Sequence, residues 1–240
     1  MMPQEPADSP RDAGWLVLTG ATSAVGQAVA AAWRQTGGRV LGVSRTDGVA
    51  GCDDWVVADL RSPWVAADRV KTALGARPVG ALVHAAGLVY ADAAVHTTPD
   101  EWDQTVAVNL TAAFALARTM APRMVAPRGV VLVGSIDARL APRAGPAAAY
   151  GAAKAGLMGL GRHLAVEWGP AGLRVNVVLP GPMTSGMGVS AERAAAGAAG
   201  AVDREWTTPD EVAALVVFLL TARGITGQAL AVDHGWQLGY

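Results

Sequence analysis

The apolar segment Trp15-Leu-Val-Leu-Thr19 runs directly into the glycine-containing stretch Gly20-Ala-Thr-Ser-Ala-Val-Gly26. The first segment predicts a buried strand, and the alanine-rich segment Gln27–Thr36 predicts a helix behind the turn. Small residues in such a turn let a ligand approach closely, and the N–H groups and dipole at a helix start favour an anion. The stretch therefore predicts a binding site for a pyrophosphate, with an ordinary tight strand–helix turn as the alternative.

Short apolar strands and helical segments alternate along the rest of the chain. Six further strands are expected at Val40–Val43, Trp55–Val57, Ala81–His84, Gly129–Val133, Arg174–Leu179 and Ala229–Val232. Longer helices are expected at Glu101–Ala121 and Tyr150–Trp168, and from the capping sequence Thr207-Thr-Pro-Asp-Glu211 to Leu220. Continuous apolar strands separated by helices indicate a parallel sheet with both faces covered. We therefore predict the α/β class: one Rossmann-fold domain over residues 14–240, with a doubly wound parallel sheet of seven strands and helices on both faces.

Composition narrows the classes of function. Hydrophobic residues make up 52% of the 240 residues and charged residues 16%, which indicates a folded domain with a sizeable core. The net charge of −1 and the absence of a basic block argue against a nucleic-acid partner. The longest apolar run, Val212–Ala222, is too short to span a bilayer, and the single cysteine, Cys52, fits a reducing cytosol. We expect a cytoplasmic protein with a disordered, polar tail over residues 1–13.

Three side chains have the chemistry that carbonyl reduction by a nicotinamide requires. Tyr150 and Lys154 are four residues apart, so on a helix they share one face. A phenol normally titrates near pH ~10, and a neighbouring cation favours the phenolate and lowers its pKa. The hydroxyl of Ser135 is available to hydrogen-bond a substrate oxygen where charge develops. This spacing is common by chance, and it gains weight from the strand–turn–helix segment upstream.

Taken together, the motifs resemble the short-chain dehydrogenase/reductase family, in particular its 3-oxoacyl-ACP-reductase-like ketoreductases. The resemblance covers roughly residues 14 to 239, and the order and spacing of the motifs make it specific. The matching residues are Thr19–Gly26, Asp59-Leu60, His84–Gly87, Asn109, Ser135, Tyr150 with Lys154, Pro180-Gly181, Ile225–Gly227 and Val232–Gly235.

The resemblance implies a role for each catalytic residue. Tyr150 would protonate the alkoxide formed when hydride reaches a carbonyl, and Lys154 would lower the pKa of Tyr150 and bind the nicotinamide ribose. Ser135 would orient the substrate oxygen, and Asn109 would hold a water that links Lys154 to solvent. No His, Cys or carboxylate cluster has metal-ligand spacing, so we expect no metal site.

The resemblance also implies the cofactor contacts. Asp59 would bind the adenine, Gly87 would lie against its ribose, and Pro180–Thr184 would border the nicotinamide. The residues expected to bind the dinucleotide are Gly20, Thr22, Ser23, Ala24, Val25, Gly26, Ser44, Arg45, Asp59, Leu60, Ala85, Ala86, Gly87, Tyr150, Lys154, Pro180, Gly181, Met183 and Thr184.

The end of the second expected strand, Ser44-Arg45, bears on the choice of cofactor. NAD-preferring relatives usually have an acidic residue at the position of Ser44, where it binds the free ribose hydroxyls. A small hydroxyl followed by a guanidinium instead suits a 2′-phosphate. NADP(H) is therefore favoured, with NAD(H) as the alternative if Arg45 is only a surface charge.

Three departures from the family pattern concern the site. Ala24 stands where the family usually has its middle glycine, and its methyl group is compatible with phosphate contact if φ stays below zero. His84-Ala85 replaces the usual Asn-Asn, and we expect His84 to be a hydrogen-bonded core residue. The loop before Tyr150 is slightly longer than usual and carries Arg139 and Arg143, which face either an anionic substrate or solvent.

The favoured function is NADPH-dependent reduction of a small-molecule carbonyl to an alcohol. The alternatives are an NAD-dependent alcohol dehydrogenase working in the oxidative direction and a non-catalytic nucleotide-binding scaffold. The segment Met183–Glu205 is expected to cover the substrate, but its alanine, glycine and methionine residues do not identify it. By analogy with the family, the helices Glu101–Ala121 and Tyr150–Trp168, with Trp236–Tyr240, suggest a homotetramer or a homodimer.

Overall fold

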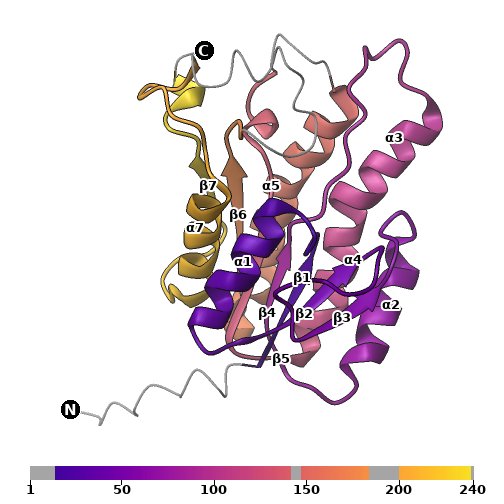
Figure 1. Cartoon of the computed structure of the whole chain (residues 1–240), viewed down its shortest axis with the longest axis vertical. Helices are drawn as coiled ribbons and strands as arrows, with labels where there is room; N and C mark the ends of the chain where they lie inside the picture. The colour runs from indigo at the N-terminus through magenta and orange to yellow at the C-terminus, as the bar shows by residue number, and fades with distance from the viewer. Residues whose placement is uncertain (1–13, 142–146, 184–199, 239–240) are drawn as a thin grey trace.

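The computed structural model of the chain describes residues 14–141, 147–183 and 200–238 (Figure 1). Seven strands form one sheet in the order β3-β2-β1-β4-β5-β6-β7, and every neighbouring pair is parallel. The strands are β1 (Trp15–Thr19), β2 (Arg39–Ser44), β3 (Asp54–Val57), β4 (Val79–His84), β5 (Met124–Val133), β6 (Arg174–Pro180) and β7 (Ala229–Val232). This confirms the predicted doubly wound Rossmann fold.

Helices cover both faces of the sheet because strand side chains alternate between two apolar surfaces. Leu16 and Leu18 of β1 pack with residues of α1 (Ala24–Gln35) and α7 (Pro209–Thr221). Val17 points the other way, into a cluster shared with the remaining long helices. Those helices are α2 (Pro63–Leu74), α4 (Ala112–Met120) and α5 (Ala148–Trp168).

The single helix expected over Glu101–Ala121 is interrupted in the structure, so that expectation was wrong. The segment forms α3 (Pro99–Val106), a π-helical turn η2 (Ala107–Thr111) and then α4. In the wide turn the N–H of Ala112 donates to the carbonyl of Ala107, five residues back. Such insertions often lie at functional sites.

The helix α2 was not expected from the sequence. Short 3-10 turns complete the described elements. The turns are η3 (Ala121–Arg123), η4 (Ile136–Ala138), η5 (Gly169–Ala171) and η6 (Trp236–Leu238). Over the described ranges, no helix has the length and apolarity needed to cross a bilayer.

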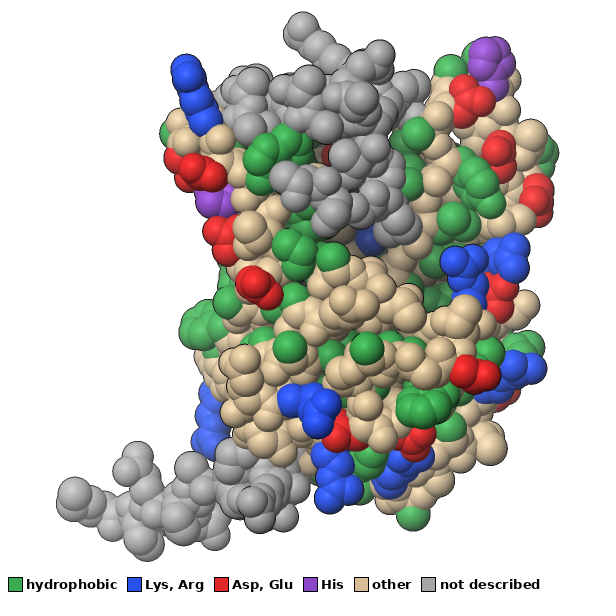
Figure 2. All heavy atoms as spheres, in the orientation of Figure 1, with side chains coloured by type: hydrophobic (Ala, Val, Ile, Leu, Met, Phe, Trp, Pro, Cys, Tyr) green, Lys and Arg blue, Asp and Glu red, His purple; other side chains and the backbone are tan. Residues whose placement is uncertain are grey.

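The fold brings the segments of interest to one edge of the sheet. The strand order reverses between β1 and β4, and in open parallel sheets ligands bind beside the carboxyl ends at this point. The glycine turn follows β1, His84 ends β4, Ser135 follows β5 and Pro180 ends β6. Figure 2 shows acidic and basic side chains interspersed over the face that it presents.

Candidate active site

The glycine turn after β1 is closed tightly around its own backbone. Gly20 has a φ of +67°, and a Cβ there would lie 2.7 Å from the N of Ala86. A Cβ on Gly26 would lie 2.2 Å from the carbonyl oxygen of Gly20. Ser23 caps α1 by accepting from the Gly26 N–H at 3.0 Å. Both glycines are therefore required by packing, which leaves the start of α1 as a compact backbone surface suited to a phosphate.

Ala24 does not strain this turn. It is the first residue of α1, and among the described non-glycine residues only Arg204 and His234 have a positive φ. Thr22, Ser23 and Ala24 are all exposed, so the side chains along the turn face outward. The condition for tolerating a methyl group at this position is met.

His84 lies buried at the junction between the glycine turn and the π-turn. Its Nδ1 is 3.0 Å from the hydroxyl oxygen of Thr19, and its Nε2 is 3.1 Å from the carbonyl oxygen of Val108. A carbonyl only accepts, so Nε2 donates and Nδ1 of the neutral ring accepts from Thr19. The Thr19 oxygen in turn accepts from the Ala86 N–H at 3.2 Å. The imidazole thereby replaces the expected side-chain amide as the link between strand ends.

Burial lowers the pKa of His84 to about 3, because desolvation penalises the imidazolium. The positive charge of Lys154 acts in the same direction, and the hydrogen bond to Val108 opposes it. His84 is therefore a neutral ring at physiological pH, as expected for a core histidine.

Asn109 lies within the π-turn and uses both ends of its amide. Its Nδ2 donates to the carbonyl oxygens of Leu88 at 2.7 Å and Thr105 at 2.9 Å, and its Oδ1 accepts from the Leu88 N–H at 3.3 Å. The side chain is fully buried. It joins the wide turn to the segment after β4, so that His84 and Asn109 both donate to carbonyls of the α3–η2 region.

The helix α5 places Tyr150 and Lys154 on one side, beside the end of β5. The Nζ of Lys154 lies 5.5 Å from the centre of the Tyr150 ring and donates to the carbonyl oxygen of Val133 at 2.7 Å. Lys154 is only 3% exposed, and desolvation lowers its pKa to about 8 while Asp137 opposes the shift. Ser135 follows β5, and its Oγ accepts from the N–H of Asp137 at 3.1 Å. The ammonium is thus buried away from solvent and close to the phenol.

The ends of β2 and β3 carry contacts that the sequence analysis did not include. Ser44 is buried, and its Oγ accepts from the N–H of Thr46 at 3.0 Å, while Arg45 is exposed. Asp59 is held by the guanidinium of Arg61, whose Nε and Nη2 lie 2.9 and 2.5 Å from Oδ2. The hydrogen bond from Arg61 lowers the pKa of Asp59. The pairing of Asp59 with Arg61 has a signal in the sequence, because the two side chains have opposite charges and are only two residues apart.

The comparisons with known proteins agree over almost the whole chain. The family model described as Enoyl-(Acyl carrier protein) reductase matches residues 20–237. D-threitol dehydrogenase of Mycolicibacterium smegmatis is 30% identical over 92% of this chain and 92% of the relative. The chain belongs to the short-chain dehydrogenase/reductase family. It is an NAD(P)-dependent oxidoreductase.

Two further relatives show the breadth of this family. Galactitol 2-dehydrogenase (L-tagatose-forming) of Cereibacter sphaeroides is 29% identical over 94% of this chain and 95% of the relative. A Beutenbergia cavernae structure, named for an NAD(P)-dependent gluconate 5-dehydrogenase, holds NADP at low occupancy. It is 34% identical over 93% of this chain and 96% of its own, with a TM-score of 0.84.

In this member of the family, Arg139 is tied to the C-terminal part of the fold. Its Nη2 donates to the carbonyl oxygen of Ala229 at 2.6 Å, and its Nη1 donates to the Oε1 of Gln237 at 3.2 Å. These contacts favour a structural role over contact with an anionic substrate. Arg143 lies outside the described residues.

The remaining expected cofactor residues are placed at the same edge of the sheet. Ala85, Ala86 and Gly87 follow β4, and Leu60 is buried after β3. At the end of β6, a Cβ on Gly181 would lie 2.7 Å from the Cα of Asp233. Val25 of α1 belongs to the buried cluster between the sheet, α1 and α7, and Met183 packs against the same cluster. Thr184 and most of the segment Met183–Glu205 lie outside the described residues.

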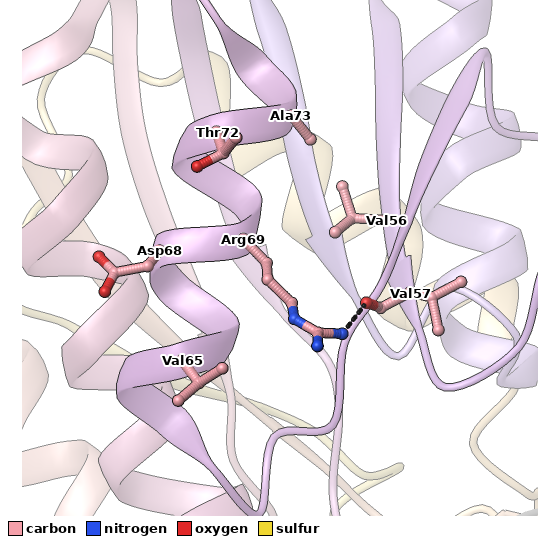
Figure 3. Close-up of a pocket in the computed structure, with 7 residues that line it drawn as sticks. All are labelled: Val56, Val57, Val65, Asp68, Arg69, Thr72 and Ala73. Atoms are coloured by element: carbon pink, nitrogen blue, oxygen red, sulfur yellow. Dashed lines mark hydrogen bonds between the residues drawn. The ribbon is translucent and has the colours of Figure 1, made fainter.

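A groove of about 500 Å³ lies elsewhere, between the edge strand β3 and α2 (Figure 3). Figure 3 shows Arg69 of α2 reaching across it, where its Nη1 donates to the carbonyl oxygen of Val57 at 3.2 Å. None of its lining residues belongs to the site above, and nothing in the structure indicates what would occupy it. Within the described ranges, no group of three His, Cys, Asp or Glu side chains could hold a metal ion.

Proposed function

We propose that the protein reduces the carbonyl group of a small molecule to an alcohol with NADPH, and that Tyr150 is the general acid. The observation that carries this proposal is the buried ammonium of Lys154, 5.5 Å from the Tyr150 ring on the same side of α5. With a pKa of about 8, this ammonium remains mostly protonated at neutral pH. It therefore presents a positive charge to the phenol under working conditions.

The closed glycine turn supports a dinucleotide site, because both glycines lie where a Cβ would collide with backbone. Gly20 to Gly26 and the start of α1 would hold the pyrophosphate, and the strand ends at Gly87 and Pro180–Met183 would border the rest. When bound, the reduced nicotinamide supplies the hydride.

The protein's own residues would orient and protonate the substrate oxygen. The hydroxyl of Ser135 donates to the carbonyl oxygen and stabilises charge that develops there. Tyr150 gives its proton to the same oxygen, and the charge of Lys154 stabilises the resulting phenolate. We propose that Asn109 supports this centre through the π-turn, with a water beside that turn linking Lys154 to solvent.

The choice of NADP over NAD rests on the end of β2. Neither Ser44 nor the exposed Arg45 supplies a carboxylate to bind free ribose hydroxyls, and a guanidinium pairs well with a 2′-phosphate. Replacement of Arg45 by Ala should raise the KM for NADPH much more than that for NADH. Equal effects on the two cofactors would remove this argument.

Replacement of Tyr150 by Phe tests the acid assignment. We expect kcat to fall by about 100-fold or more, because the proton donor is lost. NADPH binding, followed by fluorescence titration, should stay near that of the wild type. Near-normal turnover in this variant would contradict the role of Tyr150.

A second candidate is oxidation of a polyol or sugar acid, favoured by the names of the relatives, which include D-threitol, galactitol and gluconate dehydrogenases. A panel of carbonyl compounds and polyols, followed by absorbance with both cofactors in both directions, separates the two. Tight nucleotide binding without turnover of any compound would instead favour the scaffold hypothesis.

We also propose a cytoplasmic homotetramer or homodimer. An exposed apolar residue on α5, Val166 at 79% exposure, is compatible with a subunit contact. Light scattering after size-exclusion chromatography measures the assembly directly.

A further inference from the structure

His234, in the loop after β7, lies between two carboxylates from different parts of the chain. Its Nδ1 is 2.7 Å from the Oδ2 of Asp203, and its Nε2 is 3.1 Å from the Oε1 of Glu211. Asp203 comes from the segment before α7, and Glu211 lies in the first turn of α7. A carboxylate only accepts hydrogen bonds, so both ring nitrogens must donate. Only the imidazolium has two N–H groups, and this geometry therefore requires a protonated ring.

The backbone around this bridge is strained on both sides. His234 has a φ of +52° and Arg204 a φ of +64°, and these are the non-glycine residues with positive φ in the described part of the chain. The two segments are also joined through their backbones, because the N–H of Val202 donates to the carbonyl oxygen of His234 at 3.0 Å. Side chains rarely adopt this conformation without compensation from their surroundings. The two ion-paired contacts of the ring supply such compensation.

The chain contains a natural control for this arrangement. Thr98-Pro-Asp-Glu101 and Thr208-Pro-Asp-Glu211 are the same four residues, and both form a capping box at a helix start. The glutamate accepts from the threonine N–H at 2.8 Å in the first box and at 2.7 Å in the second. Glu211 additionally contacts an imidazole. Capping therefore does not explain the contact with His234.

We propose that His234 is a pH-dependent clamp that, as an imidazolium, fastens the segment around Asp203 to the start of α7. Loss of one proton leaves a single N–H for two carboxylates, so one of the two contacts must be released. The charged groups that face the ring are Asp203 and Glu211, and both raise the pKa of His234 through hydrogen bonds and charge. The neighbouring Asp233 is turned to the N–H groups of Gly235 and Gln237.

The clamp is connected to the candidate active site through Thr207. The N–H of Thr207 donates to the carbonyl oxygen of Pro182 at 3.2 Å, and its hydroxyl donates to that of Val232 at 3.1 Å. The segment that His234 fastens therefore adjoins the end of β6. The proposal does not depend on the catalytic assignment, because its test is made without substrate.

The test is a titration of the imidazole C2–H resonances of the intact protein by NMR. We expect His234 to titrate above the ordinary histidine value of ~6.5. Replacement of Glu211 by Gln should lower that pKa, whereas the matched replacement of Glu101 by Gln should leave it unchanged. A His234 that titrates at or below the ordinary value in the wild type would overturn the proposal.

A second measurement separates the clamp from a merely structural role. Hydrogen exchange at the Val202 amide, corrected for its intrinsic pH dependence, should be about three- to tenfold less protected near pH ~8.5 than near pH ~6. Replacement of His234 by Gly suits the positive φ, so the variant should fold, but it should abolish the pH dependence. An unchanged pH dependence in that variant would refute the clamp.

Discussion

His84 ends β4 and His234 follows β7, both at the carboxyl edge of the same sheet. Their surroundings nevertheless favour opposite protonation states. His84 is buried between a hydroxyl and a backbone carbonyl, and burial lowers its pKa to about 3. His234 is 19% exposed between two carboxylates, whose hydrogen bonds raise its pKa.

The difference shows how partner atoms select the form of an imidazole. One hydroxyl and one carbonyl are satisfied by one acceptor and one donor, which is the neutral ring. Two carboxylates need two donors, which is the charged ring. The comparison also separates two roles: His84 links Thr19 to the π-turn beside the candidate active site, and we propose that His234 responds to pH.

The largest effect should come from Lys154, the cation whose charge helps to lower the pKa of His84. Replacement of Lys154 by Met keeps the aliphatic stem but removes the charge beside Tyr150, so kcat should fall by about 100- to 10,000-fold. It should also raise the pKa of His84, because the repulsion from Lys154 is lost while the larger desolvation effect remains. Steady-state kinetics and histidine NMR measure the two effects. A variant with near-normal kcat and a melting temperature like that of the wild type would contradict the role of Lys154.

Removal of the neutral ring should be the next largest effect. Replacement of His84 by Leu leaves the Thr19 hydroxyl and the Val108 carbonyl without this partner in the core, and should lower the free energy of unfolding by about 2–4 kcal/mol. Urea denaturation measures it, with exposed His163 replaced by Gln as the matched control. Similar losses in the two variants would mean that the buried hydrogen bonds of His84 are not important for stability.

The pH dependence of stability should reveal His84 between its unfolded and folded pKa values. Below about pH 6.5 the unfolded chain binds a proton that the folded state refuses until about pH 3. Stability should therefore fall with decreasing pH across this window, by at most about 1.4 kcal/mol per pH unit from this residue. Replacement of His84 by Asn should remove this part of the slope. A slope that persists unchanged would place a neutral His84 in doubt.

The smallest effect should have the opposite sign and belong to His234. Its raised pKa means that its contribution is fully present below the unfolded value of ~6.5 and is lost as the pH rises through the folded value. At a partly exposed site the loss should not exceed about 1 kcal/mol. Denaturation of the wild type and of the His234→Gly variant across this range tests the sign. If the wild type gained stability relative to the variant as the pH rose, the comparison of the two histidines would fail.

Much of the fold was predictable because it rests on local pattern. Seven apolar runs and the spacing of Tyr150 and Lys154 follow from strand and helix periodicity, and the capping boxes follow from adjacent residues. The helix α2 was not among the predicted elements, although Ser62-Pro63 is a helix start signal. The π-turn was not predictable. Its Val108 carbonyl accepts a hydrogen bond from the His84 side chain, and His84 lies far from Val108 in the sequence.

The sequence by itself determined the parallel sheet, the glycine turn and the pairing of a phenol with an ammonium along one helix. The glycine turn and the phenol–ammonium pair depend on residues within a few positions of each other, where the backbone geometry fixes which side chains share a face. The parallel sheet follows from the alternation of apolar strands with helices along the chain. Only the tertiary structure decided that Lys154 is dry, that His84 is neutral and that His234 bridges Asp203 and Glu211. Protonation depends on solvent exclusion and on distant partners, and neither exists until the strand ends are brought together.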